Sequence, residues 1–163
     1  KLYTTPKASI NPKAKKAINE ADLIILAPGD LYNSIITNLI ISGTKKAIIQ
    51  SKAKIAYIVN LMTLTSQTHN FTAKDHLNEI EKYIGRKVDN ILPNNQPIPA
   101  NIIKAYQKLA EHPVQDDLSQ DKRVVRQALL ADSDYQKPKS DSLKRSLLRH
   151  DPNKLAKTIV NLV

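Results

Sequence analysis

Continuous apolar runs alternate with helix-like spacing along most of the chain. Residues 22–27 (DLIILA) and 55–59 (IAYIV) are short runs rich in Ile, which is typical of strands covered on both faces of a parallel sheet. Residues 88–92 (VDNIL) predict a third, shorter strand. A helical stretch between the first two strands predicts a parallel, right-handed strand–helix–strand unit. The pattern therefore indicates an α/β fold with a mostly parallel sheet.

Apolar residues at helical spacing predict the remaining elements. The expected helices cover residues 11–21, 31–40, 44–53, 72–84, 100–111 and 151–163. Asn11 and Asp151 each precede a proline, as N-caps do when proline takes the first helical position, and Gly85 is the expected C-cap of the fourth helix. Residues 123–130 fit either a fourth strand or a helical turn, and residues 131–144 fit a loop.

Composition places the chain among globular proteins rather than disordered ones, since 41% of its residues are hydrophobic and 25% are charged. A length of 163 residues suits one domain with a core. No run reaches the roughly 18 to 20 apolar residues of a membrane span. The absence of Cys rules out disulfides and thiolate metal sites, so we expect a cytoplasmic protein. The chain begins at Lys1 rather than Met, which suggests a fragment.

A net charge of +10 raises the question of nucleic-acid binding. The Lys residues are scattered along the whole chain, and the one dense basic patch is residues 137–149 (KPKSDSLKRSLLR). Ser and Leu interleave this patch, whereas single-strand binding uses aromatic side chains that stack on bases. We therefore do not expect a nucleic-acid partner, although the patch is compatible with binding an anion.

Polar segments follow the first two predicted strands, PGDLYNS after the first and NLMTLTSQTHNFT after the second. Ligands of open parallel sheets bind outside the carboxyl ends of the strands, so we expect both segments to line one rim. In the first segment, Tyr32 and Asn33 are candidate ligand contacts because helix caps do not need them. We interpret Asp30 as the N-cap of the next helix.

The second segment divides at Thr72, which forms a predicted capping box with Asp75. Four residues before it are not needed for capping, and their hydroxyl, amide and imidazole groups suit hydrogen bonding to a base, ribose or sugar. These are Asn60, Thr63, Thr68 and His69.

Other chemistries receive less support from the sequence. His69, Asp75 and His76 contain no pair of ligands at i and i+4, so we do not expect a metal site there. The sequence contains no nucleophile elbow such as G-x-S-x-G, so we do not expect a Ser-His-Asp triad. Arg149, just before the last helix, could pair with a phosphate or carboxylate through two hydrogen bonds. The three Gly residues form no phosphate-binding motif, so a phosphate loop, if there is one, would lie upstream of Lys1.

Three motifs, in this order, carry a resemblance to a known family. APGDLYNSIITNLI, VNLMT with the later FTAKDH, and LLRHDPNKLA resemble the GPG(S/D)LYTSIIPNLL, NLMT to GFTASDH, and RHDP-type segments of the YvcK/CofD family. The match covers nearly all of the chain. It implies a Rossmann-like, three-layer α/β protein about twice as long. Residues 1–163 would be the C-terminal part of its single domain, without the N-terminal half that carries a GGGTG-type glycine turn.

The family has two functional branches. YvcK-like proteins are cytoplasmic regulators, called gluconeogenesis factors. They bind UDP-sugars such as UDP-N-acetylglucosamine and influence carbon metabolism, cell-wall precursor supply and cell shape. CofD is a 2-phospho-L-lactate transferase of coenzyme F420 synthesis that works with magnesium. The RHD motif and FTAKDH look more like the first branch. The resemblance thus implies a non-catalytic UDP-sugar-binding regulator, with magnesium only on the CofD branch, and it is compatible with a homo-oligomer.

Residue by residue, the resemblance and the residue chemistry give one set of candidate ligand contacts. They are Gly29, Leu31, Tyr32, Asn33, Ser34, Asn60, Met62, Thr63, Thr68, Phe71, Asp75 and Arg149.

The sequence also departs from the family pattern in the second rim segment. Asn70 stands where the family has Gly, and because Asn tolerates the left-handed conformation we expect the same backbone path. His69 replaces an Asp, which puts an acidic role at that position in doubt. A further alternative is a structural or interaction fragment whose rim residues are only caps and turns. Without the glycine turn, residues 1–163 alone should bind nucleotide poorly.

Overall fold

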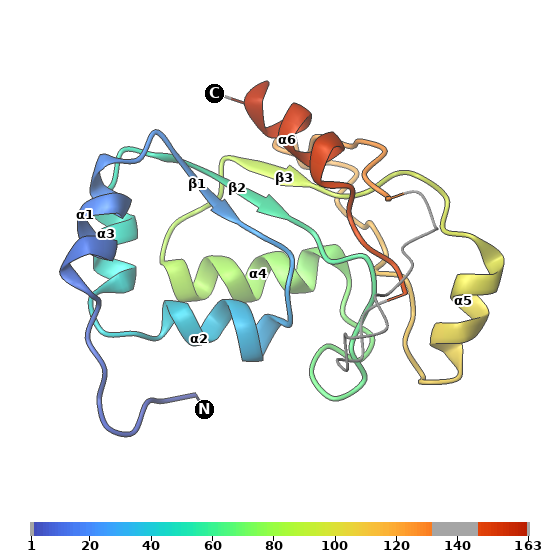
Figure 1. Cartoon of the computed structure of the whole chain (residues 1–163), viewed down its shortest axis with the longest axis horizontal. Helices are drawn as coiled ribbons and strands as arrows, with labels where there is room; N and C mark the ends of the chain where they lie inside the picture. The colour runs from blue at the N-terminus through green and yellow to red at the C-terminus, as the bar shows by residue number, and fades with distance from the viewer. Residues whose placement is uncertain (1, 132–146, 163) are drawn as a thin grey trace, which may run out of the picture.

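A parallel three-stranded sheet forms the centre of the protein (Figure 1). The computed structural model describes residues 2–131 and 147–162. The strands are β1 (Leu23–Leu26), β2 (Lys54–Ile58) and β3 (Asn90–Leu92), in the order β1-β2-β3. In the register, Leu23 pairs with Lys54, and Ala56 pairs with Asn90. The predicted α/β fold with a parallel sheet is confirmed.

Helices cover both faces of the sheet, which gives the three layers that were expected. The helical elements are α1 (Pro12–Glu20), η1 (Leu31–Ile35), α2 (Ile36–Leu39), α3 (Thr44–Gln50), α4 (Ala73–Ile84), α5 (Ala100–Gln107) and α6 (Pro152–Val160). In Figure 1, α2 and α4 lie on one face of the sheet and α6 on the other, while α1 and α3 lie together at one end.

The predicted caps of α1, α4 and α6 are confirmed. The side chain of Asn11 accepts a hydrogen bond from the Lys13 N–H (2.8 Å). Thr72 and Asp75 form the reciprocal capping box, at 3.2 Å and 3.0 Å. Asp151 Oδ1 accepts from two backbone N–H groups of α6. These local hydrogen bonds satisfy helix donors that have no partner inside the helix, so the helix starts follow from short stretches of sequence.

The interpretation of Asp30 as a helix cap is wrong. Its side chain makes no capping hydrogen bond, and the helix after it begins as a π-helical turn, η1. The Asp30 carbonyl accepts from both Ser34 N (2.8 Å) and Ile35 N (3.2 Å), so a wide backbone turn replaces the side-chain cap. The Asp30 carboxylate is thereby left for another use. Turns of this kind often occur at functional sites.

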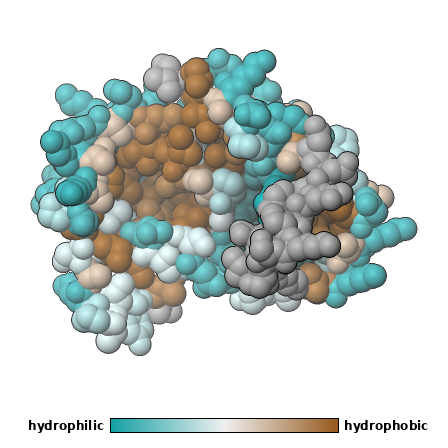
Figure 2. All heavy atoms as spheres, in the orientation of Figure 1, coloured by the Kyte–Doolittle hydropathy of each residue, from teal (hydrophilic) through white to brown (hydrophobic). Residues whose placement is uncertain are grey.

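β2 is buried on both faces, as predicted, but β1 is not. Tyr57 and Ile58 point to opposite faces of β2 and are 0% and 2% exposed. Ile25, in β1, is 43% exposed because β1 is an edge strand and no described element covers this position. Figure 2 shows a hydrophobic area where Figure 1 places β1. The expectation that β1 is covered on both faces is therefore wrong for this chain.

Residues 123–130 form neither a regular strand nor a helical turn. They run beside β3 and join it through isolated bridges, Ile91 with Val124 and Asn94 with Gln127, both parallel. Val125 N donates to Ile91 O (2.8 Å), and Leu129 N donates to the Asn94 side chain (3.0 Å). The side chain of Asn94 thus replaces one ladder partner, which makes this an irregular edge. The predicted loop at residues 131–144 lies, after its first residue, outside the described residues.

Candidate functional site

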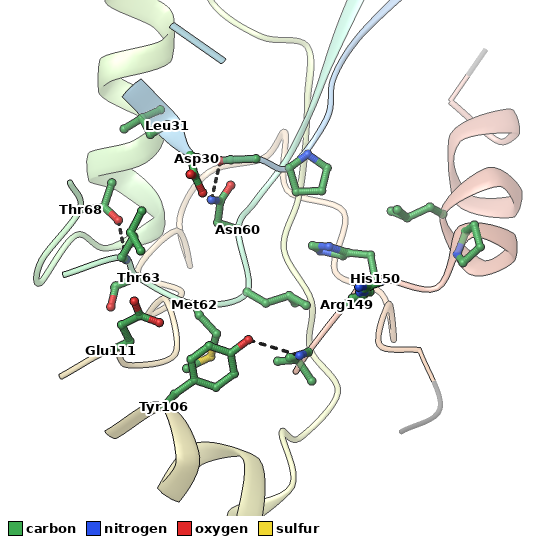
Figure 3. A pocket seen from close by; sticks show the side chains of 17 residues that line it. Asp30, Leu31, Asn60, Met62, Thr63, Thr68, Tyr106, Glu111, Arg149 and His150 are labelled. Carbon is green, nitrogen blue, oxygen red and sulfur yellow. Dashed lines mark hydrogen bonds between the residues drawn. The ribbon is translucent and has the colours of Figure 1, made fainter. Parts of the chain in front are cut away.

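A cavity of about 620 Å³ lies beyond the carboxyl ends of β1 and β2 (Figure 3). Both polar segments that follow these strands reach it, as expected for a parallel sheet. A third wall comes from the chain before and within α6. Its lining consists of Pro28, Gly29, Asp30, Leu31, Asn60, Leu61, Met62, Thr63, Leu64, Thr68, Tyr106, Glu111, Leu148, Arg149, His150, Pro152 and Leu155.

Asn60 joins the two rim segments. Its Nδ2 donates to the Gly29 carbonyl over 2.8 Å, so the end of β2 is tied to the turn after β1. Asn60 Oδ1 is buried and has no hydrogen-bond partner among the described residues. Asn60 also borders a second cavity of about 350 Å³, whose wall includes the amides of Asn94, Asn95 and Gln96. The Asn60 amide therefore fixes the rim and lies between the two cavities.

Two rim threonines hold the loop after β2 in shape. Thr63 Oγ1 accepts from His112 N (3.0 Å), and Thr68 Oγ1 accepts from Leu64 N (2.9 Å). Both residues are nearly buried, at 4% and 2% exposure. The sequence analysis missed these partners because neither belongs to a helix cap. Each hydroxyl accepts a backbone N–H and keeps its own proton as a donor.

The segment after α5 crosses the rim and forms part of the wall. Met62 and Pro113 form an antiparallel bridge. Thr63 N donates to His112 O (2.8 Å), and Val114 N donates to Leu61 O (3.0 Å). Glu111, the residue before this bridge, lies at the cavity beside Thr63 in Figure 3. Backbone hydrogen bonds between two segments about 50 residues apart thus place the carboxylate of Glu111 in the cavity wall.

Arg149 and His150 form the wall on the α6 side. His150 is bridged to Leu130, and Ala131 N donates to Arg149 O over 2.9 Å. Burial lowers the pKa of His150 to about 4, although a hydrogen bond to the Val59 backbone opposes that shift. His150 is therefore neutral near pH 7 and acts as a hydrogen-bonding group, whereas Arg149 keeps its positive charge.

The structure brings part of the predicted set to the cavity and places the rest elsewhere. Gly29, Leu31, Asn60, Met62, Thr63, Thr68 and Arg149 line it. Tyr32, Asn33, Ser34, Phe71 and Asp75 do not.

The residues outside the cavity have other contacts. Tyr32 and Phe71 pack against the core, with the Phe71 ring edge-on to His76. Burial and the nearby Glu79 raise the pKa of Tyr32. Asn33 is exposed, and its carbonyl accepts from a hydroxyl in α2. Tyr32 and Phe71 thus face the helix layer and Asn33 faces solvent, although all three lie next to the rim in sequence.

The three other histidines of the chain do not line the cavity. His76 is fully buried, its Nδ1 is 2.9 Å from the Thr72 carbonyl, and burial lowers its pKa. His69 is exposed on the loop. Within residues 2–131 and 147–162, no group of three or more His, Cys, Asp or Glu side chains is arranged to hold a metal ion.

The sequence analysis missed Asp30, Tyr106, Glu111, Leu148 and His150 as lining residues. Tyr106 is nearly buried, and its hydroxyl accepts from Leu148 N (3.3 Å). No local pattern marks Tyr106 or Glu111, because they reach the rim through pairing with a distant loop. Asp30 lies shortly after β1, a position typical of ligand contacts in a parallel sheet. We interpreted it as a helix cap instead.

Comparison with known proteins places the chain in a family. The profile of the family described as 2-phospho-L-lactate transferase CofD matches residues 1–132. A gluconeogenesis factor of Bacillus subtilis is 33% identical over 157 residues, covering 93% of this chain and 46% of that protein. The gluconeogenesis factor of Halalkalibacterium halodurans is 34% identical over 163 residues, covering 98% and 48%.

The fold agrees with a solved structure of the same group. The crystal structure of a UPF0052 family member from Bacillus halodurans superposes with a TM-score of 0.82 and 30% identity, covering 97% of this chain and 49% of that one. This chain thus spans about half the length of the relatives it matches. No helix in the described ranges is long and apolar enough to cross a membrane. Sequence and fold agree, and the chain belongs to the CofD/UPF0052 family, with relatives named gluconeogenesis factors.

Proposed function

We propose that this chain is part of a YvcK-like regulator that binds a UDP-sugar such as UDP-N-acetylglucosamine without transforming it. In this proposal the protein is cytoplasmic and controls carbon metabolism, cell-wall precursor supply and cell shape. The names of its relatives, gluconeogenesis factors at 33% and 34% identity over nearly the whole chain, support the regulatory part. The cavity supports the ligand part.

The observation that carries the proposal is the convergence of three separated segments on one cavity, with Arg149 in its wall. A volume of about 620 Å³ lies within the roughly 300–1,000 Å³ of small-molecule sites. Arg is suited to a diphosphate because its planar guanidinium donates two parallel hydrogen bonds to phosphate oxygens. Asn60 and the rim threonines offer neutral polar groups to the rest of the ligand.

Binding of UDP-N-acetylglucosamine tests the proposal. The protein as encoded in full, residues 1–163 included, is titrated by calorimetry and compared with Arg149→Ala and with Lys104→Ala. The second variant removes a charge from the exposed face of α5, away from the cavity. Loss of a charge-assisted pair should weaken binding about tenfold or more in Arg149→Ala, with no change in Lys104→Ala. Equal affinity in all three proteins would remove Arg149 from the site.

The family profile itself motivates a second candidate, a 2-phospho-L-lactate transferase that uses magnesium. An assay for transfer of a phospholactyl group, with and without magnesium, separates the two candidates. Transfer that depends on magnesium would replace the regulator by the enzyme.

We also propose that the ligand site is completed outside residues 1–163. The relatives are about twice as long, and the three Gly residues here form no phosphate-binding turn. Titration of residues 1–163 alone should therefore show much weaker binding than the full protein. Equal affinity would show that this half is sufficient.

A further inference from the structure

The cavity wall contains a carboxylate that the fold does not use. Glu111 is half-buried and lines the cavity. Within residues 2–131 and 147–162, its side chain makes no hydrogen bond or ion pair. The buried Glu81, by contrast, binds Lys87 (2.6 Å) and Arg123 (2.7 Å). Partial burial makes a carboxylate without a partner costly, so a role in binding is a reasonable explanation for Glu111.

The backbone around Glu111 is held firmly at the end of α5. Ala110, just before it, has a φ of 56°, in the left-handed region that is unfavourable for a residue with a Cβ. Thr65 Oγ1 lies 2.8 Å from Leu109 O and 3.0 Å from Ala110 O, and donates to this turn. Glu111 N donates to Tyr106 O (3.1 Å).

The residue after Glu111 is fixed as well. His112 N donates to Thr63 Oγ1 (3.0 Å), and Thr63 N donates to His112 O (2.8 Å). The Glu111 backbone thus lies between two anchored points, one at the end of α5 and one on the rim loop. A backbone held this way needs no ordering when a ligand binds, which lowers the entropic cost of binding.

Glu111 and Arg149 lie on different sides of the cavity, whose wall also contains Asp30. Figure 3 shows Glu111 beside Thr63 and Met62, and Arg149 beside His150 on the other side of the cavity. A carboxylate repels phosphate, so an anionic ligand group belongs at the Arg149 side. A carboxylate offers two acceptor oxygens side by side. A nucleotide sugar donates neutral hydrogen bonds from N–H groups and from hydroxyls, and a pair of neighbouring hydroxyls is the part that can donate to both oxygens at once.

We propose that Glu111 recognises a vicinal diol of the ligand, with its two carboxylate oxygens accepting hydrogen bonds from neighbouring hydroxyl groups. This inference rests on the proposed function, since it assigns a part of the same ligand. In dinucleotide-binding folds an acidic residue accepts from a ribose hydroxyl in the same way. The diol is either that of the ribose or that of the hexose, and three ligands distinguish them.

The experiment titrates UDP, 2′-deoxy-UDP and UDP-N-acetylglucosamine into the full protein, into Glu111→Gln and into Glu20→Gln. Glu111→Gln keeps the shape and one acceptor but loses the charge. Glu20→Gln is the matched control, because Glu20 is an exposed carboxylate in α1, far from the lining. Thermal unfolding of each variant accompanies the titration, and Glu111→Gln should unfold at the temperature of the wild type because the Glu111 side chain makes no hydrogen bond or ion pair among the described residues.

The results separate the possible diols. If Glu111 binds the ribose, Glu111→Gln should bind UDP and UDP-N-acetylglucosamine about tenfold more weakly. The wild type should then prefer UDP over 2′-deoxy-UDP, and the variant should lose that preference. If Glu111 binds the hexose, only the affinity for UDP-N-acetylglucosamine should fall.

Two results would overturn the inference, and a third would refute the proposed function as well. Unchanged affinity of Glu111→Gln for all three ligands would exclude contact with a diol. Tighter binding by the variant would mean that the carboxylate only repels phosphate. A wild-type protein that binds none of the three ligands would refute the proposed function and the diol together, whereas the first two results leave the proposed function standing.

Discussion

Replacing Ala110 by Gly should stabilise the protein. Ala110 has a φ of 56° and is exposed, so its methyl group contributes little packing. The left-handed conformation costs an L-residue roughly 1–2 kcal/mol because Cβ approaches the following carbonyl oxygen. Glycine avoids this contact. Ala110→Gly should therefore remove backbone strain at one residue without removing a packing contact.

The expected gain is the difference between two opposing effects. Gly relieves the left-handed strain, roughly 1–2 kcal/mol, but it raises the entropy of the unfolded chain by an equivalent of about 0.4–1 kcal/mol. The net gain should be about 0.8 kcal/mol, within a range of about 0 to 1.6 kcal/mol. For a protein of this size, 1 kcal/mol shifts Tm by about 2–4 °C. The turn keeps its hydrogen bonds from Thr65 Oγ1, because they go to backbone carbonyls.

Urea unfolding followed by circular dichroism measures the change, with Asn70→Gly as the matched control. Asn70 has a φ of 61°, close to that of Ala110, but Asn adopts this conformation at lower cost. We therefore expect a clear gain for Ala110→Gly and little or none for Asn70→Gly. Destabilisation by Ala110→Gly, or an equal gain in both variants, would show that the backbone strain at residue 110 is not what limits stability.

Three further changes test other parts of the structure. Thr63→Val should destabilise by about 1–3 kcal/mol, because the His112 N–H loses a buried acceptor; Thr63→Ser should restore most of it in the same unfolding assay. Glu81→Gln should cost about 3 kcal/mol, because the side chains of Arg123 (2.7 Å) and Lys87 (2.6 Å) lose their anionic partner, although the carboxamide keeps one acceptor oxygen; a loss below 1 kcal/mol would contradict this. The free energy of unfolding should fall as pH drops from about 6.5 toward 4, by up to about 1.4 kcal/mol per pH unit. The reason is that folding lowers the pKa of His150 to about 4, so the unfolded chain binds more protons than the folded chain in this range. His150→Gln should flatten this slope in urea titrations at several pH values.

Local features were predictable wherever the deciding contacts are local. Asn11 and Asp151 cap their helices through bonds to residues two or three positions away, and Asn70 takes the left-handed conformation that was expected. β2 was predictable from five apolar residues because both faces are covered. Residues 123–130 were not, because their pairing depends on the Asn94 side chain and on the neighbouring β3.

The predictable part of the site mostly follows a strand, and Arg149, which precedes α6, is the exception. Gly29 and Asn60 could be placed together because the ends of parallel strands share a rim, and the structure joins them at 2.8 Å. Tyr106 and Glu111 could not be placed, because a bridge between distant loops brings them to the cavity. Thr63 lies at the cavity, and its hydroxyl also accepts from the backbone, which no sequence pattern indicated. Polar side chains on a rim therefore predict its location better than their individual roles.

The proposal that the ligand site is completed outside residues 1–163 agrees with the position of β1 at the sheet edge. Within the described ranges β1 pairs with β2 alone, so its outer backbone groups lack sheet partners, and Ile25 is 43% exposed. The same strand leads directly into Gly29 and Asp30 of the cavity. A further strand added in parallel along β1 would pair with its outer backbone groups and would also bring its own carboxyl end to this rim, because parallel strands end on the same side. The relatives are about twice as long, which is enough chain for such an addition.

Residues 1–163 alone should therefore show two defects together, self-association through the β1 edge and weak ligand binding, and both should disappear in the full protein. If only one of them disappears, the sheet edge and the ligand rim are completed by different parts of the protein.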